Sequence, residues 1–154
     1  MFMINTEDEM LTFGSHIAAA CEPGMVVFLE GELGAGKTTM VRGVLNAFGY
    51  HGVVKSPTYT LVEQYDFSDK TVFHLDLYRL AAAEELEYMG GRDYFSADVL
   101  SFVEWPEQGQ GYLPQPDLII TILYRGLRQR SVELAAFSER GKKVITMLAK
   151  NSGL

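Results

Sequence analysis

A phosphate-binding loop is the clearest chemical feature of this sequence. Residues 31–39 read GELGAGKTT, so Gly31, Gly36, Lys37 and Thr38 satisfy the pattern G-x-x-x-x-G-K-[ST]. Glycines let successive backbone N–H groups converge on phosphate oxygens. The lysine ammonium of this motif reaches the β- and γ-phosphates, and the next hydroxyl ligates Mg²⁺. An apolar segment precedes the loop and a helical pattern follows it, so the sequence predicts nucleotide binding.

The nucleotide is expected to be ATP. GTPases carry an Asn-Lys-x-Asp sequence that reads guanine and an Asp-x-x-Gly sequence at a switch, and neither occurs in this chain. The sequence therefore favours ATP over GTP.

Two carboxylates near strand ends are the candidate partners of the loop. In residues 72–79, VFHLDLYR, apolar residues alternate with His74 and Asp76, as in a strand with two different faces. We interpret Asp76 as a Walker B carboxylate that holds Mg²⁺ through water; the alternative is an aspartate that merely ends a strand. His74 interrupts the apolar run and is interpreted as a hydrogen-bonded structural residue. Glu104 ends another apolar strand and is assigned to Mg²⁺, against the alternative of a solvent-facing strand end.

A loop rich in hydroxyl groups follows the predicted nucleotide-binding helix. Residues 55–60 read KSPTYT, with Ser56, Thr58 and Thr60 around a proline that disfavours helix at the residue before it. Such a loop can be ordered by the γ-phosphate and Mg²⁺ and released after hydrolysis. An ordinary polar turn explains the residues equally well, so both interpretations stay open.

The surrounding periodicities predict a single α/β domain over residues 1–154. Its fold is P-loop NTPase-like, with a mostly parallel central sheet flanked by helices and with antiparallel hairpin strands. A Thr6–Glu9 capping box starts the first helix, which ends at Pro23–Gly24. The expected elements after it are strand 25–30, helix 37–48, strands 59–67 and 71–79, helix 81–89, strand 98–105, and a hairpin of 117–124 with 129–137. The tail from Ser138 is too mixed to assign.

Composition limits the functional classes further. The net charge is -7, with 6 basic and 18 acidic residues in 1–124 (about -12) against 7 basic and 2 acidic residues in 125–154 (about +5). An acidic body disfavours unaided binding of nucleic acid. The single Cys21 forms no internal disulfide and is expected to be buried, and the histidines form no metal motif. No apolar run is long enough to span a membrane, so we expect a cytoplasmic protein.

The motifs GELGAGKTT, SPTYTL, HLDLYR with EELEYMG, and VEWPEQG together resemble those of the bacterial TsaE (YjeE) family. The resemblance extends from about residue 25 to residue 116, and the order and spacing of the motifs make it far more specific than the loop alone. Members of that family are small P-loop ATPases. They serve the machinery that places a threonylcarbamoyl group on the adenosine next to the anticodon of tRNAs, together with the proteins TsaD and TsaB.

The resemblance implies roles for individual residues. It makes Asp76 the Walker B residue, Thr38 and Glu104 the Mg²⁺ ligands, and Trp105 part of the same functional motif, where packing is the alternative. Ser56 to Thr60 become a switch-like loop. The residues implied to contact the nucleotide, ATP or ADP, are Leu33, Gly34, Ala35, Gly36, Lys37, Thr38 and Thr39. The basic stretch Arg125–Arg130 and the residues near Thr6 match no motif of the family.

These features lead to one functional hypothesis and two alternatives. The chain lacks a long insertion that could close over a second small substrate, so we expect the energy of ATP to act on the TsaD and TsaB proteins, with tRNA reached through them. A small-molecule kinase is the first alternative, and it would need a mobile lid rich in arginine. The second alternative is an interaction module that senses ATP without hydrolysing it.

Overall fold

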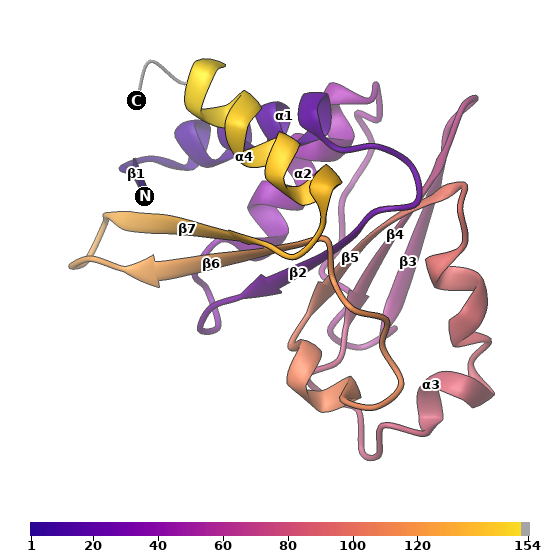
Figure 1. The fold of residues 1–154 in the computed structure, drawn as a ribbon. Helices are drawn as coiled ribbons and strands as arrows, with labels where there is room; N and C mark the ends of the chain where they lie inside the picture. The colour runs from indigo at the N-terminus through magenta and orange to yellow at the C-terminus, as the bar shows by residue number, and fades with distance from the viewer. Residues whose placement is uncertain (152–154) are drawn as a thin grey trace.

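The computed structural model describes residues 1–151, which form one seven-stranded sheet and the helices that pack on it (Figure 1). The strands are β1 (Phe2–Ile4), β2 (Val26–Glu30), β3 (Val62–Asp66), β4 (Thr71–Asp76), β5 (Val99–Glu104), β6 (Leu118–Tyr124) and β7 (Arg130–Ala136). The α-helices are α1 (Glu7–Ala20), α2 (Lys37–Ala47), α3 (Glu85–Tyr88) and α4 (Glu139–Asn151). Short 3₁₀ helices cover Gly91–Phe95 and Pro106–Gly109.

The strand order confirms the predicted fold class. The sheet runs β1-β7-β6-β2-β5-β4-β3. The central strands β6, β2, β5 and β4 are parallel to their neighbours within this group, whereas β3, β7 and β1 pair antiparallel at the two sides. The predicted hairpin of 117–124 with 129–137 is present as β6–β7, and β3 and β4 form a second hairpin. A parallel centre brings the carboxyl ends of β2, β4 and β5 to one edge of the sheet, which is where α/β proteins of this kind bind ligands.

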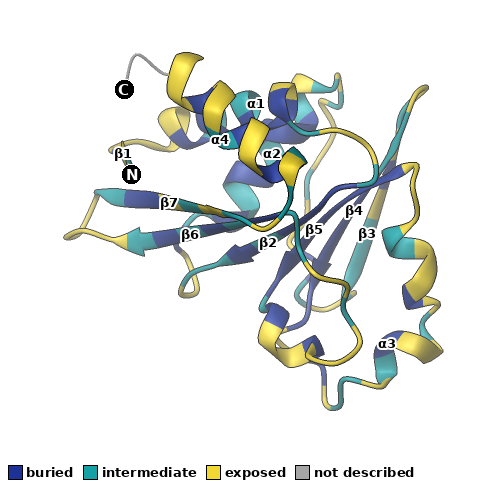
Figure 2. Ribbon diagram, viewed as in Figure 1, coloured by how far each residue is buried: buried dark blue, intermediate teal, exposed yellow. Residues whose placement is uncertain are grey.

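Helices cover one face of the sheet, and shorter segments cover part of the other (Figures 1 and 2). The first face carries the larger apolar cluster, which joins α1, α2 and α4 to the sheet through side chains such as Ile17, Met40 and Val144. The second cluster lies beneath α3 and the 3₁₀ helices and includes Leu75 and Leu86. Strand β5 is buried at every position, and β2 is buried except at Phe28 and Glu30, which are partly exposed, as the apolar runs of the two sequences predict.

Helix α1 begins at the predicted capping box. The Thr6 hydroxyl accepts a hydrogen bond from the Glu9 backbone N–H at 3.1 Å, and the Glu9 carboxylate accepts one from the Asn5 N–H at 2.6 Å. The helix then crosses α2 at very short range, because a Cβ on Gly14 would overlap the Met40 carbonyl. Two glycines, Gly14 and Gly43, make this approach possible. It anchors the helix that follows the glycine-rich loop.

Several predictions of secondary structure were incomplete or wrong, and among them the strands predicted over 59–67 and 71–79 are shortened to Val62–Asp66 and Thr71–Asp76. The sequence analysis did not predict β1, which pairs with β7 from the far end of the chain. It left residues from 138 onward unassigned, and those up to Asn151 contain α4. The helix predicted over 81–89 is reduced to Glu85–Tyr88, because residues 81–84 form a bend and a turn instead, and the left-handed Gly90, with a φ of 83°, leads the chain into the 3₁₀ helix after it. Residues 152–154, the end of the unassigned tail, lie outside the described residues. None of the helices within residues 1–151 is long and apolar enough to cross a membrane.

Candidate nucleotide site

The glycine-rich loop, residues 31–36, joins the carboxyl end of β2 to the first turn of α2. Gly36 takes a φ of 114°, which side chains other than glycine rarely adopt, and it leaves the first backbone N–H groups of α2 without side-chain caps. At Gly31 a Cβ would lie 2.7 Å from the Ile122 carbonyl oxygen, so this position has no room for a side chain. The loop therefore presents backbone N–H groups at a helix N-terminus, where the helix dipole favours anions.

Lys37 is almost fully buried beneath this loop, with 5% of its surface exposed. Its ammonium donates a hydrogen bond to the Gly31 carbonyl and lies 4.0 Å from Oε1 of Glu104. It also lies 4.4 Å from the centre of the Trp105 ring, a distance typical of a cation–π contact. Burial lowers the pKa of the Lys37 ammonium, and nearby carboxylates, Glu104 first, oppose that shift. The lysine is thus held inside the protein by three neighbouring groups.

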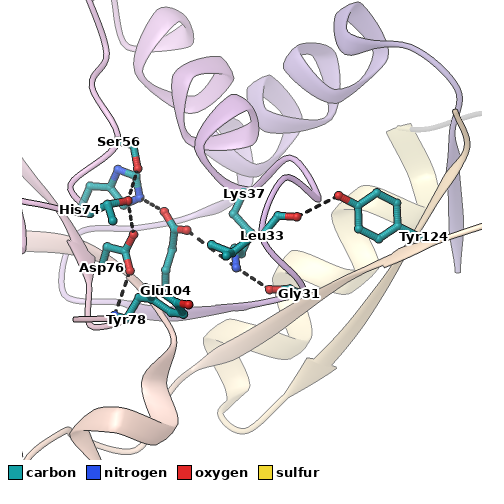
Figure 3. Close-up of polar contacts among 10 residues, drawn as sticks. Gly31, Leu33, Lys37, Ser56, His74, Asp76, Tyr78, Glu104 and Tyr124 are labelled. Atoms are coloured by element: carbon teal, nitrogen blue, oxygen red, sulfur yellow. Dashed lines mark hydrogen bonds and ion pairs between the residues drawn. The ribbon is translucent and has the colours of Figure 1, made fainter. Parts of the chain in front are cut away.

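The two predicted carboxylates lie side by side at the ends of adjacent strands (Figure 3). Asp76 ends β4 and Glu104 ends β5, and the two residues are register partners in the parallel ladder. Each is 3% exposed. Oε2 of Glu104 lies 2.5 Å from Nε2 of His74, and the Asp76 carboxylate accepts a hydrogen bond from the Tyr78 N–H at 3.0 Å. Glu104 is therefore not a solvent-facing strand end, and Asp76, which ends β4, is buried beside it.

The hydroxyl-rich loop contacts this pair of carboxylates through Thr58. Its hydroxyl donates a 3.0 Å hydrogen bond to Oδ2 of Asp76 and lies 2.8 Å from the hydroxyl of Ser56. Thr60 lies apart, because its hydroxyl donates to Glu63 at an exposed position. Directly after Thr60 the backbone is turned by Leu61, whose φ is 67°, before β3 begins at Val62. The loop is therefore joined to the strand-end carboxylates by one short chain of hydrogen bonds.

A hollow of about 190 Å³ lies between the glycine-rich loop, the hydroxyl-rich loop and the two strand ends. Most of the predicted site residues line it. They are Leu33, Gly34, Gly36, Lys37, Thr38, Thr39, Ser56, Thr58, Asp76 and Glu104. Ala35 faces a neighbouring hollow instead, and Thr60 lines neither. The hollow thus combines backbone N–H groups, one ammonium, hydroxyls and two carboxylates.

Trp105 follows Glu104 and lines neither hollow, but it contacts residues of the site. It has a left-handed backbone, with φ 55°, and its ring packs against that of Tyr78 at 5.0 Å between centroids. Within residues 1–151 its indole Nε1 is buried without a hydrogen-bond partner. Since the ring also contacts the Lys37 ammonium, packing alone does not describe this residue. It joins the strand end to the lysine of the glycine-rich loop.

A second hollow, of about 180 Å³, lies on the other side of the glycine-rich loop. Its walls include Asn5 and Thr6 before α1, and Arg128 and Arg130 from the β6–β7 hairpin. Tyr124 of the same hairpin donates a hydrogen bond to the Leu33 carbonyl at 2.9 Å (Figure 3). The sequence marked these regions only by a capping box and a basic stretch, because nothing local reveals that the two meet at the loop.

The sheet, the glycine-rich loop between β2 and α2, and the carboxylates at the neighbouring strand ends define a protein of P-loop NTPase-like fold. Comparison with protein families identifies the family within this class. Residues 4–132 match the model described as "Threonylcarbamoyl adenosine biosynthesis protein TsaE". The chain belongs to the TsaE family, as its motifs predicted.

Individual relatives agree with this assignment. The chain is 48% identical over 148 residues to the tRNA threonylcarbamoyladenosine biosynthesis protein TsaE of Haemophilus influenzae, with 93% of each chain covered. It is 34% identical over 137 residues to the TsaE protein of Bacillus subtilis, covering 89% of this chain and 85% of that one. Among solved structures, YdiB of Bacillus subtilis superposes with a TM-score of 0.84 at 28% identity, covering 99% and 95% of the two chains.

Proposed function

We propose that this chain is a Mg²⁺-dependent ATP-binding protein with weak ATPase activity, required for threonylcarbamoyl-adenosine modification of tRNA. One observation carries the proposal. The ammonium of Lys37 and the carboxylates of Asp76 and Glu104 line a single hollow at the N-terminus of α2. Cation, helix dipole and backbone N–H groups attract phosphates, while the carboxylates suit a divalent cation. This division of roles is the one that P-loop ATPases use.

The hollows on the two sides of the glycine-rich loop suit different parts of a nucleotide. We place the phosphates in the hollow that contains Lys37, and the nucleoside in the second hollow, between Asn5 and Arg128. The guanidinium of Arg130 already lies 4.0 Å from the Tyr124 ring, so this wall offers a flat, cationic surface to a base. The basic stretch, which the sequence left without a role, thus becomes part of the proposed ATP site.

The donor set also fits Mg²⁺. The Thr38 hydroxyl and the Glu104 carboxylate would hold the ion directly, and Asp76 through water, which gives the oxygen ligands that Mg²⁺ prefers. When bound, the ion would supply positive charge that neutralises the charge developing during phosphoryl transfer. Before this can happen Lys37 must leave the Gly31 carbonyl and turn toward the phosphates.

Asp76 connects the site to the hydroxyl-rich loop. Its carboxylate accepts a hydrogen bond from Thr58, so a change at the γ-phosphate can be passed to residues 56–60. We propose that this loop is a nucleotide-driven switch, or reset, for a complex of the TsaD and TsaB proteins, and that turnover is slow without them. The acidic body of the chain disfavours direct binding of tRNA, so the tRNA would be reached through the complex.

The site assignment is tested by two substitutions and a control. We expect Lys37→Ala to lower turnover about 100-fold or more, since it removes a charge that stabilises the transferring phosphoryl group. Glu104→Ala should still bind ATP but lose Mg²⁺-dependent hydrolysis. Lys143→Ala, which changes an exposed lysine of α4, should behave as wild type. The measurements are calorimetric titration of ATP and release of inorganic phosphate. Normal hydrolysis in both site variants would overturn the assignment.

The pathway and the switch need separate tests. Depletion of the protein in its own cells should remove threonylcarbamoyl-adenosine from tRNA, as measured by mass analysis of nucleosides, and wild type but not Lys37→Ala should restore it. For the switch, TsaD and TsaB together should raise the rate of phosphate release. A full rate without partners, unchanged by their addition, would refute that part of the proposal. A phosphorylated metabolite in place of free phosphate would favour a kinase.

A further inference from the structure

His74 is a polar residue in an otherwise apolar part of the core. It lies in β4 two residues before Asp76, on the strand face that packs toward α2, and its side chain is fully buried. Its register partner in β5 is Phe102. Burying an imidazole costs free energy unless its nitrogens are hydrogen-bonded. In the described part of the chain Nδ1 has no partner, so the contact made by Nε2 is the one that accounts for a histidine at this position.

That contact holds one oxygen of Glu104. Nε2 of His74 lies 2.5 Å from Oε2, whereas Oε1 faces the Lys37 ammonium at 4.0 Å. The two partners differ in mobility. The imidazole is short, fully buried and fixed to a central strand, while Lys37 has a long side chain at the start of α2 and must reorient if phosphates are to bind. When Lys37 moves, Oε2 remains held and Oε1 becomes free.

We propose that His74 is a positioning residue, which fixes Oε2 of Glu104 so that Oε1 points to Mg²⁺. This inference rests on the proposed function, in which Glu104 is a metal ligand. Hydrogen bonds to the second oxygen of a ligating carboxylate orient it, and loss of such a partner typically lowers metal affinity 10- to 100-fold. A histidine interrupts the apolar strand β4 because it is needed to position the Glu104 carboxylate of the neighbouring strand β5.

The test compares His74→Leu with His74→Gln. A glutamine amide can place an N–H donor near the position of Nε2, whereas leucine offers no donor. We expect His74→Leu to raise the Mg²⁺ concentration needed for half-maximal ATP binding 10- to 100-fold, with ATP affinity in EDTA changed less than twofold. His74→Gln should recover at least part of the Mg²⁺ affinity. Calorimetric titration of ATP at a series of Mg²⁺ concentrations measures both quantities.

Two further variants separate positioning from structure. Ser101→Ala removes another buried polar group on β5, one that donates to the Tyr94 carbonyl away from the site, and it should leave the Mg²⁺ dependence unchanged. In a Glu104→Gln background, His74→Leu should have little further effect, because the group that it positions is no longer a carboxylate. If His74→Leu fails to fold, His74→Asn replaces it, since the shorter amide does not reach Oε2.

The outcomes distinguish this inference from the proposed function. A wild type whose ATP binding and ATP hydrolysis are both independent of Mg²⁺ would overturn the proposed function, and the inference with it. A Mg²⁺-dependent wild type with the same Mg²⁺ affinity in His74→Leu would overturn the inference alone. An equal loss from His74→Leu with or without Glu104 would also overturn it, because the effect would then be structural.

Discussion

At the scale of single residues, the site is defined by charges that are buried together. Lys37, Asp76 and Glu104 are each at least 95% buried, and isolated charges at such depth would be strongly destabilising. They are tolerated because each has partners: carbonyl and carboxylate for the lysine, hydroxyl and backbone N–H for the aspartate, imidazole for the glutamate. Removing one member leaves the others uncompensated, so the polar cluster acts as a unit.

The contact between Lys37 and Trp105 predicts an optical signal. Trp105 is the only tryptophan of the chain, and an ammonium 4.4 Å from its ring perturbs the emission of the indole. If ATP draws the ammonium to the phosphates, the emission changes in intensity or wavelength, and Lys37→Met shows an altered spectrum that ATP no longer changes. A fluorescence titration with ATP checks this. An unchanged wild-type spectrum at saturating ATP would show that the lysine does not move.

Cys21, which is half-buried and not fully buried as the sequence analysis expected, gives a second prediction at this scale. Burial, and then the charges of Asp117 and Glu22, raise the pKa of its thiol from 9.0 to about 12. Because the thiolate is the reactive form, native Cys21 at pH 8 should react with iodoacetamide more slowly than the same thiol in urea, as followed by intact mass. The native state should also lose stability as the pH rises from 9 toward 12, since only the unfolded thiol ionises there. Equal alkylation rates in the two states would contradict the prediction.

At the scale of elements, the crossing of α1 and α2 determines where the glycine-rich loop lies. Gly14 of α1 faces the Met40 carbonyl, and Gly43 of α2 faces Leu11. With no side chain on either helix at this point, the backbones touch. The start of α2, and with it Lys37, is therefore fixed relative to the N-terminal segment that forms the second hollow.

Substitution at this crossing should destabilise the protein. In an open helix Gly→Ala stabilises by about 0.5–1 kcal/mol, but at Gly14 the new methyl group overlaps backbone atoms, and overpacking costs about 1–3 kcal/mol. We expect Gly14→Ala to lower the free energy of unfolding by about 2 kcal/mol in urea denaturation, with an unchanged m-value. Thr12→Ala, at an exposed position of α1, is the control and should stay within about 0.5 kcal/mol. A Gly14→Ala protein as stable as wild type would mean that the helices can separate at little cost.

The elements also show what the sequence could and could not predict. The strand, loop and helix around residues 25–48 were predictable because apolar runs, glycines and a 3.6-residue period all act locally. Strand β1 was not, because three residues form a strand only by pairing with β7, more than 120 positions away. Helix α4 carries Val144 and Leu148 one turn apart, but the many charged residues between and around them made this helical spacing of apolar residues hard to recognise. The sequence showed that His74 interrupts an apolar strand, but it did not show that Glu104 is its hydrogen-bond partner.

At the scale of the whole molecule, the two faces of the sheet are covered unequally. Helices α1, α2 and α4 pack on one face, whereas the other is covered by α3, of four residues, and by short 3₁₀ turns (Figure 2). Segments with few buried contacts open locally at lower free energy than central strands. The candidate nucleotide site lies at the edge of the sheet where β4 and β5 end, so we expect the strand ends to stay fixed and the hydroxyl-rich loop to be the part that responds to a ligand.

Amide hydrogen exchange should reveal this difference. Amides of β2 and β5 should exchange most slowly, because both faces of these strands are covered, and amides of residues 85–95 should exchange much faster. If the proposed function holds, ATP with Mg²⁺ should slow exchange in residues 31–39 and 55–61, since phosphates bind the first and order the second, while residues 85–95 stay unchanged. Mass spectrometry of peptic fragments measures all three regions in one experiment. If residues 85–95 were protected from exchange as strongly as β2, the two faces of the sheet would not differ in stability. If ATP with Mg²⁺ left exchange in residues 55–61 unchanged, that loop would not respond to the nucleotide.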